Sequence, residues 1–374
     1  MGSAFNLGKV FGIQFRLHYT WFIVFVLISM SLSWYYFPSL NLDLTPLAYW
    51  VIGIASSLLF FASVVAHELA HSLVARTNGI PVKSITLFIF GGIAQITREA
   101  TKANAELKMA AAGPACSLVL GGLFGLLWLF SRGISEPMGA MTSWLAQVNV
   151  ILAVFNLIPG FPLDGGRVFR SILWRFTGNY KLSTRIATQV GQGVGYLFIL
   201  SGISIMFLLR GGWFSGLWLI LIGWFLRNTA SSSYHQAQWR EALREVSASQ
   251  VMTSGCPVIP PNITLNQMVQ EYVFTSGCYF FLVADEGGIK GILTLNNIKA
   301  VSRQNRDVTQ VQEIMTPVDR VKVAHPDQDA LSILEEMDEN DINQMPVESG
   351  GNVIGLVTRD NLIRFLRTRS ELGA

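Results

Sequence analysis

Residues Ala66–His71 read AHELAH, and this stretch ends an uncharged run that begins near Leu47. Two His residues four positions apart lie about 40° apart on one face of an α-helix, so His67 and His71 can reach one metal ion. Glu68 is the residue type that acts as general base beside a metal-polarised water in this motif. An ionised acid inside a bilayer span costs about 2.5–3.5 kcal/mol unless it is paired or solvated. The stretch therefore predicts a zinc site in a membrane helix; the alternative is a chance match of polar residues in a helix.

The composition is that of a membrane protein with a soluble part. The chain has 374 residues, of which 51% are hydrophobic and 14% charged, with a net charge of +3. Charged residues are sparse up to about Phe225 and frequent afterwards, which predicts a membrane half followed by a soluble half. The basic residues form no strip interleaved with aromatic residues, so the pattern argues against nucleic-acid binding. Cys116, Cys256 and Cys278 give neither a disulfide framework nor a paired metal-binding motif.

Six apolar runs are predicted to cross a bilayer. The first is too long for a signal-peptide core and lacks a cleavage pattern, so we expect it to remain as an anchor. Residues 81–97, PVKSITLFIFGGIAQIT, predict a β-hairpin at the membrane surface or in a protein-lined cavity. The hairpin is either purely structural or has an edge that accepts an extended peptide. The six runs are His18–Phe37, Pro46–Thr77, Asn104–Phe130, Met141–Ile158, Gly191–Leu209 and Trp213–Arg227.

Charge in the loops predicts the orientation of these runs. Six spans put both termini on one side, where fifteen Lys and Arg residues lie in or beside the loops, against Arg132 and Arg210 on the other side. By the positive-inside rule the richer side is cytoplasmic. We therefore expect a multi-pass protein of the plasma membrane, in contact with the lipid bilayer, with its termini and the active-site end on the cytoplasmic side.

The fourth run leads into NLIPGFPLDGGR, residues 156–167, where two prolines and three glycines must end the helix. Asp164 is the only formal charge between Ser143 and Gly166. A zinc ion held by two His residues needs a third protein ligand and keeps one position open for water. Because the predicted topology brings this loop and the His pair to the same end, Asp164 is a candidate third ligand. The alternative is an ordinary Asp-Gly turn.

The soluble half repeats itself. Residues 251–253 (VMT) recur as 314–316 (IMT), and residues 291–294 (GILT) recur as 355–358 (GLVT), so the offsets are 63 and 64 residues. This predicts a tandem pair of small α/β units. The expected domains are a membrane domain at 1–229, a polar linker at 230–249, and two units at 250–304 and 308–369.

The two motifs, HExxH and Asn-x-x-Pro-x-x-Pro-x-Asp-Gly, resemble those of the site-2 protease family, in the subgroup that carries tandem cystathionine-β-synthase (CBS) domains. The resemblance covers nearly the whole chain. It implies an α-helical polytopic membrane domain of six transmembrane helices with a small membrane-associated β-hairpin or sheet, followed by a soluble α/β CBS pair. The implied function is that of an intramembrane zinc metalloendopeptidase that cuts transmembrane proteins by zinc-activated water, with the CBS pair as a cytoplasmic regulatory module.

The same resemblance assigns the site residues. It implies one Zn²⁺ per chain, bound by His67, His71 and Asp164. Glu68 would be the catalytic base, and Asn156 would help to hold the tetrahedral oxyanion.

The CBS pair implies an adenine nucleotide as ligand, but the chain departs from the usual pattern. The carboxylate expected three residues after each Thr is an Asn, which binds a ribose hydroxyl more weakly than a charged acceptor does. The alternative is a module for homodimerisation or substrate gating that binds no nucleotide. A rival class, a CBS-gated transporter or channel, predicts ionisable residues or broken helices along a through-path, whereas here they collect at one end. The candidate nucleotide contacts are Thr294, Asn297, Thr358 and Asn361.

Overall fold

A computed structural model describes residues 4–89, 91–96, 98, 100–208, 212–255, 257–276, 278, 280–286, 288–317, 321–340, 342–350 and 352–372. Arg210 and Cys256 lie outside these residues, as do Phe90 and Thr97 of the predicted hairpin. The chain divides into two compact units, Met1–Gln238 and Trp239–Ala374.

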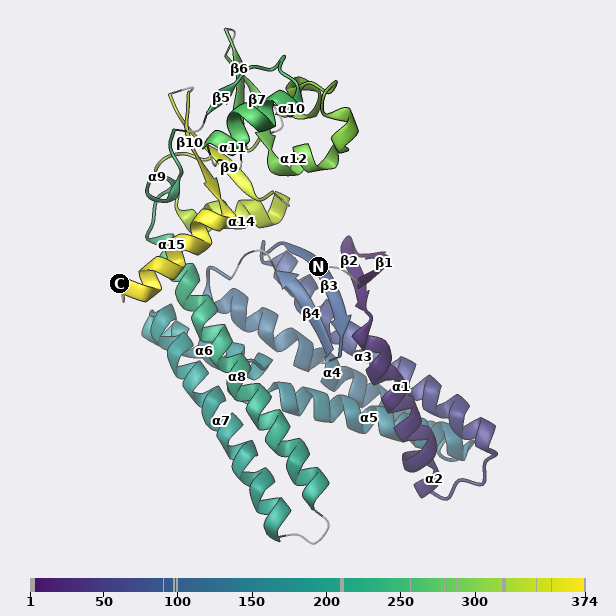
Figure 1. The fold of residues 1–374 in the computed structure, drawn as a ribbon. Helices are drawn as coiled ribbons and strands as arrows, with labels where there is room; N and C mark the ends of the chain where they lie inside the picture. The colour runs from purple at the N-terminus through teal and green to yellow at the C-terminus, as the bar shows by residue number, and fades with distance from the viewer. Residues whose placement is uncertain are drawn as a thin grey trace. The chain divides into compact units, whose positions relative to one another are not determined.

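Long helices make up most of the first unit (Figure 1). In the part of the chain that the structure describes, five helical runs are long and apolar enough to cross a membrane. Only 17% to 33% of the apolar window of each run is buried, as expected if lipid covers the remainder. The five runs are α1 (Thr20–Ser31) continued by η1 (Leu32–Tyr36) and α2 (Phe37–Ser39), α3 (Pro46–Thr77), α4 (Ala103–Ser131), α5 (Glu136–Asn156) and α7 (Tyr180–Leu208).

Two further helices complete this part of the chain. α6 (Asp164–Thr177) is short and amphipathic, and α8 (Trp213–Arg244) contains the predicted sixth run but continues through the polar residues after it. α7 begins at Tyr180, well before the predicted start at Gly191. The difference has a simple cause: hydropathy ends a run at the first charged residues, whereas backbone hydrogen bonding continues through them.

A four-stranded sheet accompanies the helices, in the order β1-β2-β3-β4. Its strands are β1 (Ala4–Val10), β2 (Ile13–His18), β3 (Val82–Phe88) and β4 (Gly91–Ile96). β3 and β4 pair antiparallel within the segment predicted as a hairpin, and β2 pairs parallel to β3. β1 and β2 were not predicted from the sequence, although β2 alternates buried and half-buried side chains as a half-buried strand should.

The sheet packs on the helix that carries the AHELAH stretch. Ile13, Phe15 and Ile85 are buried against Val65 and Leu69 of α3. Burying an aliphatic or aromatic side chain contributes roughly 1.5–3 kcal/mol, so this contact fixes the sheet on the α3 face next to His67 and Glu68.

The second unit contains two similar halves, each with an antiparallel strand pair followed by a helix. In the first half β6 (Phe280–Asp285) and β7 (Gly288–Thr294) precede α12 (Leu295–Ala300). In the second half β9 (Gln344–Ser349) and β10 (Asn352–Thr358) precede α15 (Arg359–Leu372). The other elements are α9 (Ala248–Val251), β5 (Val258–Ile259), α10 (Leu265–Met268), η2 (Val269–Val273), α11 (Phe274–Ser276), η3 (Arg303–Asn305), α13 (Val311–Ile314), β8 (Thr316–Pro317) and α14 (Ala330–Asn340).

The two halves exchange segments. The segment just before the first half pairs with the second half, and the segment just before the second half pairs with the first. Thr253 exchanges two backbone hydrogen bonds with Leu356 of β10, and Thr316 of β8 pairs with Ile292 of β7. The buried cores follow the same exchange, since residues 243–251 pack with residues 324–366 of the second half. Residues 311–315 pack in turn with residues 259–298 of the first half.

Candidate metal centre

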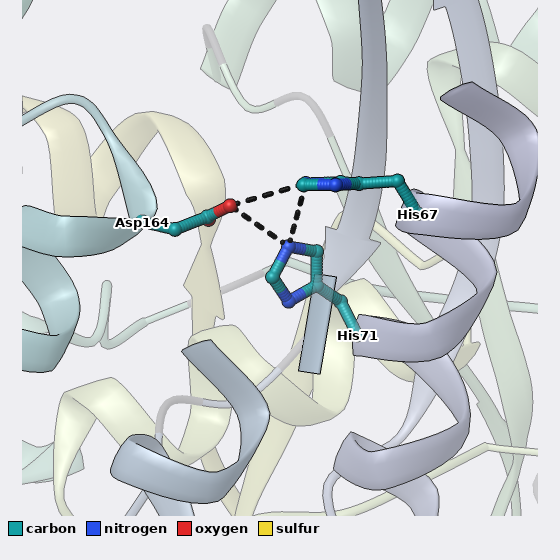
Figure 2. Close-up of side chains that lie close together, drawn as sticks. All are labelled: His67, His71 and Asp164. Carbon is teal, nitrogen blue, oxygen red and sulfur yellow. Dashed lines mark hydrogen bonds and ion pairs between the residues drawn. The ribbon is translucent and has the colours of Figure 1, made fainter. Parts of the chain in front are cut away.

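Three side chains from two helices converge at one point (Figure 2). Nε2 of His67 lies 3.2 Å from Nε2 of His71, and Oδ2 of Asp164 lies 3.1 Å and 3.0 Å from these two nitrogens. Both residues are buried: 4% of the surface of His67 is exposed and 6% of that of His71. His67 and His71 share one face of α3, as their spacing predicts, and Asp164 is the first residue of α6.

The donor set fits zinc. Tetrahedral coordination with bonds of 2.0–2.1 Å places neighbouring donor atoms about 3.3 Å apart, and the three separations here are 3.0 to 3.2 Å. Two imidazoles and one carboxylate match the three-ligand sets of catalytic zinc sites, which keep a fourth position for water. Burial alone would raise the pKa of Asp164, but its contacts with His67 and His71 hold this pKa well below its usual range. The carboxylate is therefore available in its anionic form.

Helix α4 orients both imidazoles from behind. Nδ1 of His71 lies 2.6 Å from the carbonyl oxygen of Met109, and Nδ1 of His67 lies 2.9 Å from the hydroxyl of Ser117. A carbonyl oxygen only accepts, so Nδ1 of His71 carries the proton and its Nε2 is left as the ligand atom. Such outer partners fix the tautomer and the ring orientation of metal-binding His residues. Neither partner was predicted from the sequence, although Ser117 is a polar residue within an apolar run.

The same helix approaches the imidazoles closely through Gly113. A Cβ atom at this position would overlap Nε2 of His71 and lie 2.6 Å from Nε2 of His67. The absence of a side chain at Gly113 therefore keeps the ligand-facing side of the two rings open.

Glu68 is half-buried and lies beside strand β4. A Cβ atom at Gly92 of β4 would overlap Cγ of Glu68 and lie 2.9 Å from its Cδ. Glu68 is not part of the cluster of metal-binding atoms. Glu68 lies next to the cluster, on the helix that carries both imidazoles. Because its carboxylate is not one of the metal-binding groups, it can act in proton transfer.

Gly92→Ala is expected to lower kcat for peptide hydrolysis by about 10- to 100-fold, because the new methyl group displaces the Glu68 carboxylate and misplacement of a catalytic group by 1 Å can cost 10²-fold. Zinc content should stay at the wild-type level, since His67, His71 and Asp164 are not touched. Steady-state rates and metal analysis on the purified variant check this. A wild-type rate would show that β4 does not confine Glu68.

Asn156 is the last residue of α5, and its side chain turns back along its own helix. Its amide donates to the carbonyl oxygen of Leu152 at 3.0 Å. The structure thus brings the two His residues and Asp164 together but does not bring Asn156 into hydrogen-bond contact with them. A role at the oxyanion requires its side chain to rotate away from Leu152.

Close backbone contacts at two glycines set the turn from α5 to α6. A Cβ atom at Gly165 would overlap the carbonyl oxygens of Leu157 and Ile158, and one at Gly166 would overlap the backbone of Gly160. Only glycine allows these approaches. The two glycines after Asp164 therefore let the chain fold back tightly, so that α6 starts at the metal centre.

The four candidate nucleotide contacts lie at helix starts in the second unit. Thr294 caps α12, and Asn297 accepts from its backbone N–H while donating to the carbonyl oxygen of Ile314 at 3.0 Å. Asn361 donates to the hydroxyl of Thr253 at 2.8 Å, and its backbone N–H donates to Thr358. Both amide side chains therefore already form hydrogen bonds within the protein, to the segments that the two halves exchange.

Comparison with known proteins finds relatives along nearly the full length. Residues 55–140 and 134–202 match the family model of peptidase family M50, and residues 248–303 and 311–368 match that of the CBS domain. A Synechocystis protein named as a zinc metalloprotease is 36% identical over 98% of this chain and 97% of its own. Rip3 of Mycobacterium tuberculosis, named likewise, is 32% identical over 98% of this chain and 93% of its own. A solved structure of a site-2 protease from Methanocaldococcus jannaschii covers 61% of this chain and 94% of its own, at 30% identity and a TM-score of 0.42.

Proposed function

This chain belongs to peptidase family M50, the site-2 proteases, and is a zinc metalloprotease with a CBS pair; from that premise we propose that it cuts membrane-spanning proteins at a centre formed by His67, His71 and Asp164. The observation that carries the proposal is the convergence of the three donor atoms at separations of 3.0 to 3.2 Å. The predicted family and enzyme class are confirmed by the relatives. The rival class of a CBS-gated transporter is not needed to explain any of these residues.

The chain's own residues divide the chemistry. When bound, zinc supplies a positive centre that makes a water molecule more acidic and polarises the scissile carbonyl. Glu68 accepts the proton of the attacking water and passes it to the leaving amine. The amide of Asn156, once released from Leu152, donates a hydrogen bond to the oxyanion.

The substrate must present an extended segment at this centre, because the hydrogen bonds and side chains of a helix screen its carbonyls. Among the described strands β4 is an edge strand, paired only with β3, and its Gly92 lies beside Glu68. An unwound segment that adds to this edge would be held through its backbone, next to the base.

The membrane arrangement that goes with this function has six spans, the sixth being the apolar first half of α8. The excess of Lys and Arg on the side of the termini supports a cytoplasmic location for the termini, the CBS pair and the active-site end. This orientation would suit a plasma-membrane protein.

The CBS pair serves in this proposal as a regulatory module that controls access of substrate, with homodimerisation as one route. Adenine nucleotide is its candidate ligand. Because Asn297 and Asn361 already bind the segments at Ile314 and Thr253, a ribose would have to compete with these internal hydrogen bonds. The internal bonds favour the gating or dimerising role over nucleotide binding.

Removal of the metal tests the proposal. Chelation followed by gel filtration is expected to abolish cleavage of a membrane-spanning reporter by the purified full-length protein in liposomes, and added Zn²⁺ should restore it, because His67, His71 and Asp164 alone do not polarise water. Reporter cleavage and metal content are measured together. The same segment without a membrane anchor is the control, and is expected to be cut more slowly. Full cleavage by metal-free protein would refute the assignment.

A further inference from the structure

A buried ion pair joins α6, which begins with Asp164, to α4, the helix that orients both imidazoles. Arg170 of α6 donates from Nε to Oε1 of Glu106 at 2.9 Å, and its Nη2 donates to the same oxygen. Glu106 lies in the first turn of α4. Only 2% of Glu106 and 6% of Arg170 is exposed, and charged residues are almost never buried to this degree unless they are paired.

Two aromatic rings also contact the guanidinium group. The central carbon of Arg170 lies 5.0 Å from the ring centre of Phe161, in the turn between α5 and α6, and 4.7 Å from that of Tyr180, at the start of α7. Both distances are within the range of cation–π contacts. Glu106 binds the edge of the guanidinium group and neutralises its charge, while the two rings lie against the group. The orientation of the Arg170 side chain is therefore fixed.

The pair sits where it controls the distance from Asp164 to the imidazoles. Asp164 and Arg170 are six residues apart on α6, about 9 Å along its axis, while Glu106 is one turn before Met109 on α4. α4 contacts both imidazoles through Met109 and Ser117. A tilt of α6 by about 6° around Arg170 would move Asp164 by about 1 Å, whereas metal–ligand distances hold to within ±0.2 Å.

We propose that Glu106 and Arg170 are positioning residues for the carboxylate ligand: the buried pair fixes α6 against α4 and thereby sets Asp164 at metal-binding distance from His67 and His71. The inference rests on the proposed zinc centre. It differs from a role in stability, because it requires the pair to act on metal affinity through one ligand, Asp164.

A double-mutant cycle separates the two roles. Zinc affinity of the full-length detergent-solubilised protein is measured by competition with a chromophoric chelator for the wild type, Glu106→Gln, Asp164→Asn and the double variant. We expect Glu106→Gln to weaken zinc binding about tenfold, the lower range for outer partners of a metal site. In the Asp164→Asn background the same change should have no further effect, because the ligand that the pair positions is already lost.

Two further measurements accompany the cycle. Visible spectra of the Co²⁺-substituted protein should show the four-coordinate bands weakened in Glu106→Gln. Arg359→Met, which breaks the partly exposed Asp338–Arg359 pair of the second unit, is the control and should leave zinc affinity and spectrum unchanged.

Three results would overturn the inference. Wild-type zinc affinity in folded Glu106→Gln shows that the pair does not position Asp164. An equal loss in both backgrounds shows a general effect on the fold. If Glu106→Gln does not fold, Arg170→Lys decides in the same cycle, since Lys keeps the charge but not the two-pronged bond or the stacking, and unchanged affinity refutes the inference. A wild type that binds no zinc would instead refute the proposed function.

Discussion

Glu68→Gln is expected to lower the rate of peptide hydrolysis by about 10²- to 10⁴-fold, the range for loss of a general acid–base group. Gln has nearly the same shape as Glu but cannot accept the proton of the attacking water. Because the donor cluster consists of His67, His71 and Asp164, the variant should retain one zinc ion per chain. Single-turnover cleavage of a membrane-spanning reporter measures the rate, and metal analysis on the same preparation measures the zinc content.

Glu136→Gln is the matched control, because Glu136 is an exposed acid in the first turn of α5, at the opposite end of that helix from Asn156. It should leave both rate and zinc content unchanged. Undiminished cleavage by Glu68→Gln would eliminate Glu68 as the base. Loss of zinc together with activity would instead make it a metal ligand.

Gly113→Ala is expected to abolish both zinc binding and cleavage. The added methyl group would overlap Nε2 of His71 and lie 2.6 Å from Nε2 of His67, which is the space that a metal ion needs beside these atoms. The same substitution should stabilise the helix itself, since Ala in a helix interior is favoured over Gly by roughly 0.5–1 kcal/mol. The variant should therefore remain folded while losing its metal, as zinc analysis and circular dichroism would show.

Gly122→Ala is the control on the same helix, since a Cβ atom at Gly122 meets nothing within 4 Å. It should keep wild-type zinc content and activity. If Gly113→Ala also kept its zinc, α4 would have to move away from the imidazoles without loss of coordination, and the close approach would not matter to the centre.

The ligands of the centre could be predicted from the sequence because local rules place them. Helical periodicity puts His67 and His71 on one face, and Asp164 is a lone charge in a broken helix at the same end of the predicted topology. Gly113, Ser117 and the Met109 carbonyl could not be predicted, because their role depends on how α4 crosses α3. A backbone carbonyl has no signature in the sequence at all.

The strands also differ in whether local sequence specifies them. The segment around Gly91 and Gly92 carries a local hairpin pattern, whereas β2 pairs with β3, a partner far along the chain, and a short alternating stretch does not specify so distant a partner. The predicted role of Asn156 depends on one side-chain rotation, which sequence reasoning does not address.

The reciprocal exchange in the second unit has a consequence for how the protein is made. Thr253 finds its partner only when Leu356 has left the ribosome, and at 5–20 residues per second this takes roughly 5–20 s after Thr253 is synthesised. The first half waits in the same way for β8, because Gly291 and Ile292 lack the strand that pairs with them until Thr316 and Pro317 have been made. Each half is open to chaperones and proteases until its partner segment has been synthesised. A premature stop between the two halves would therefore leave a fragment destined for degradation, even though it contains one complete sequence repeat.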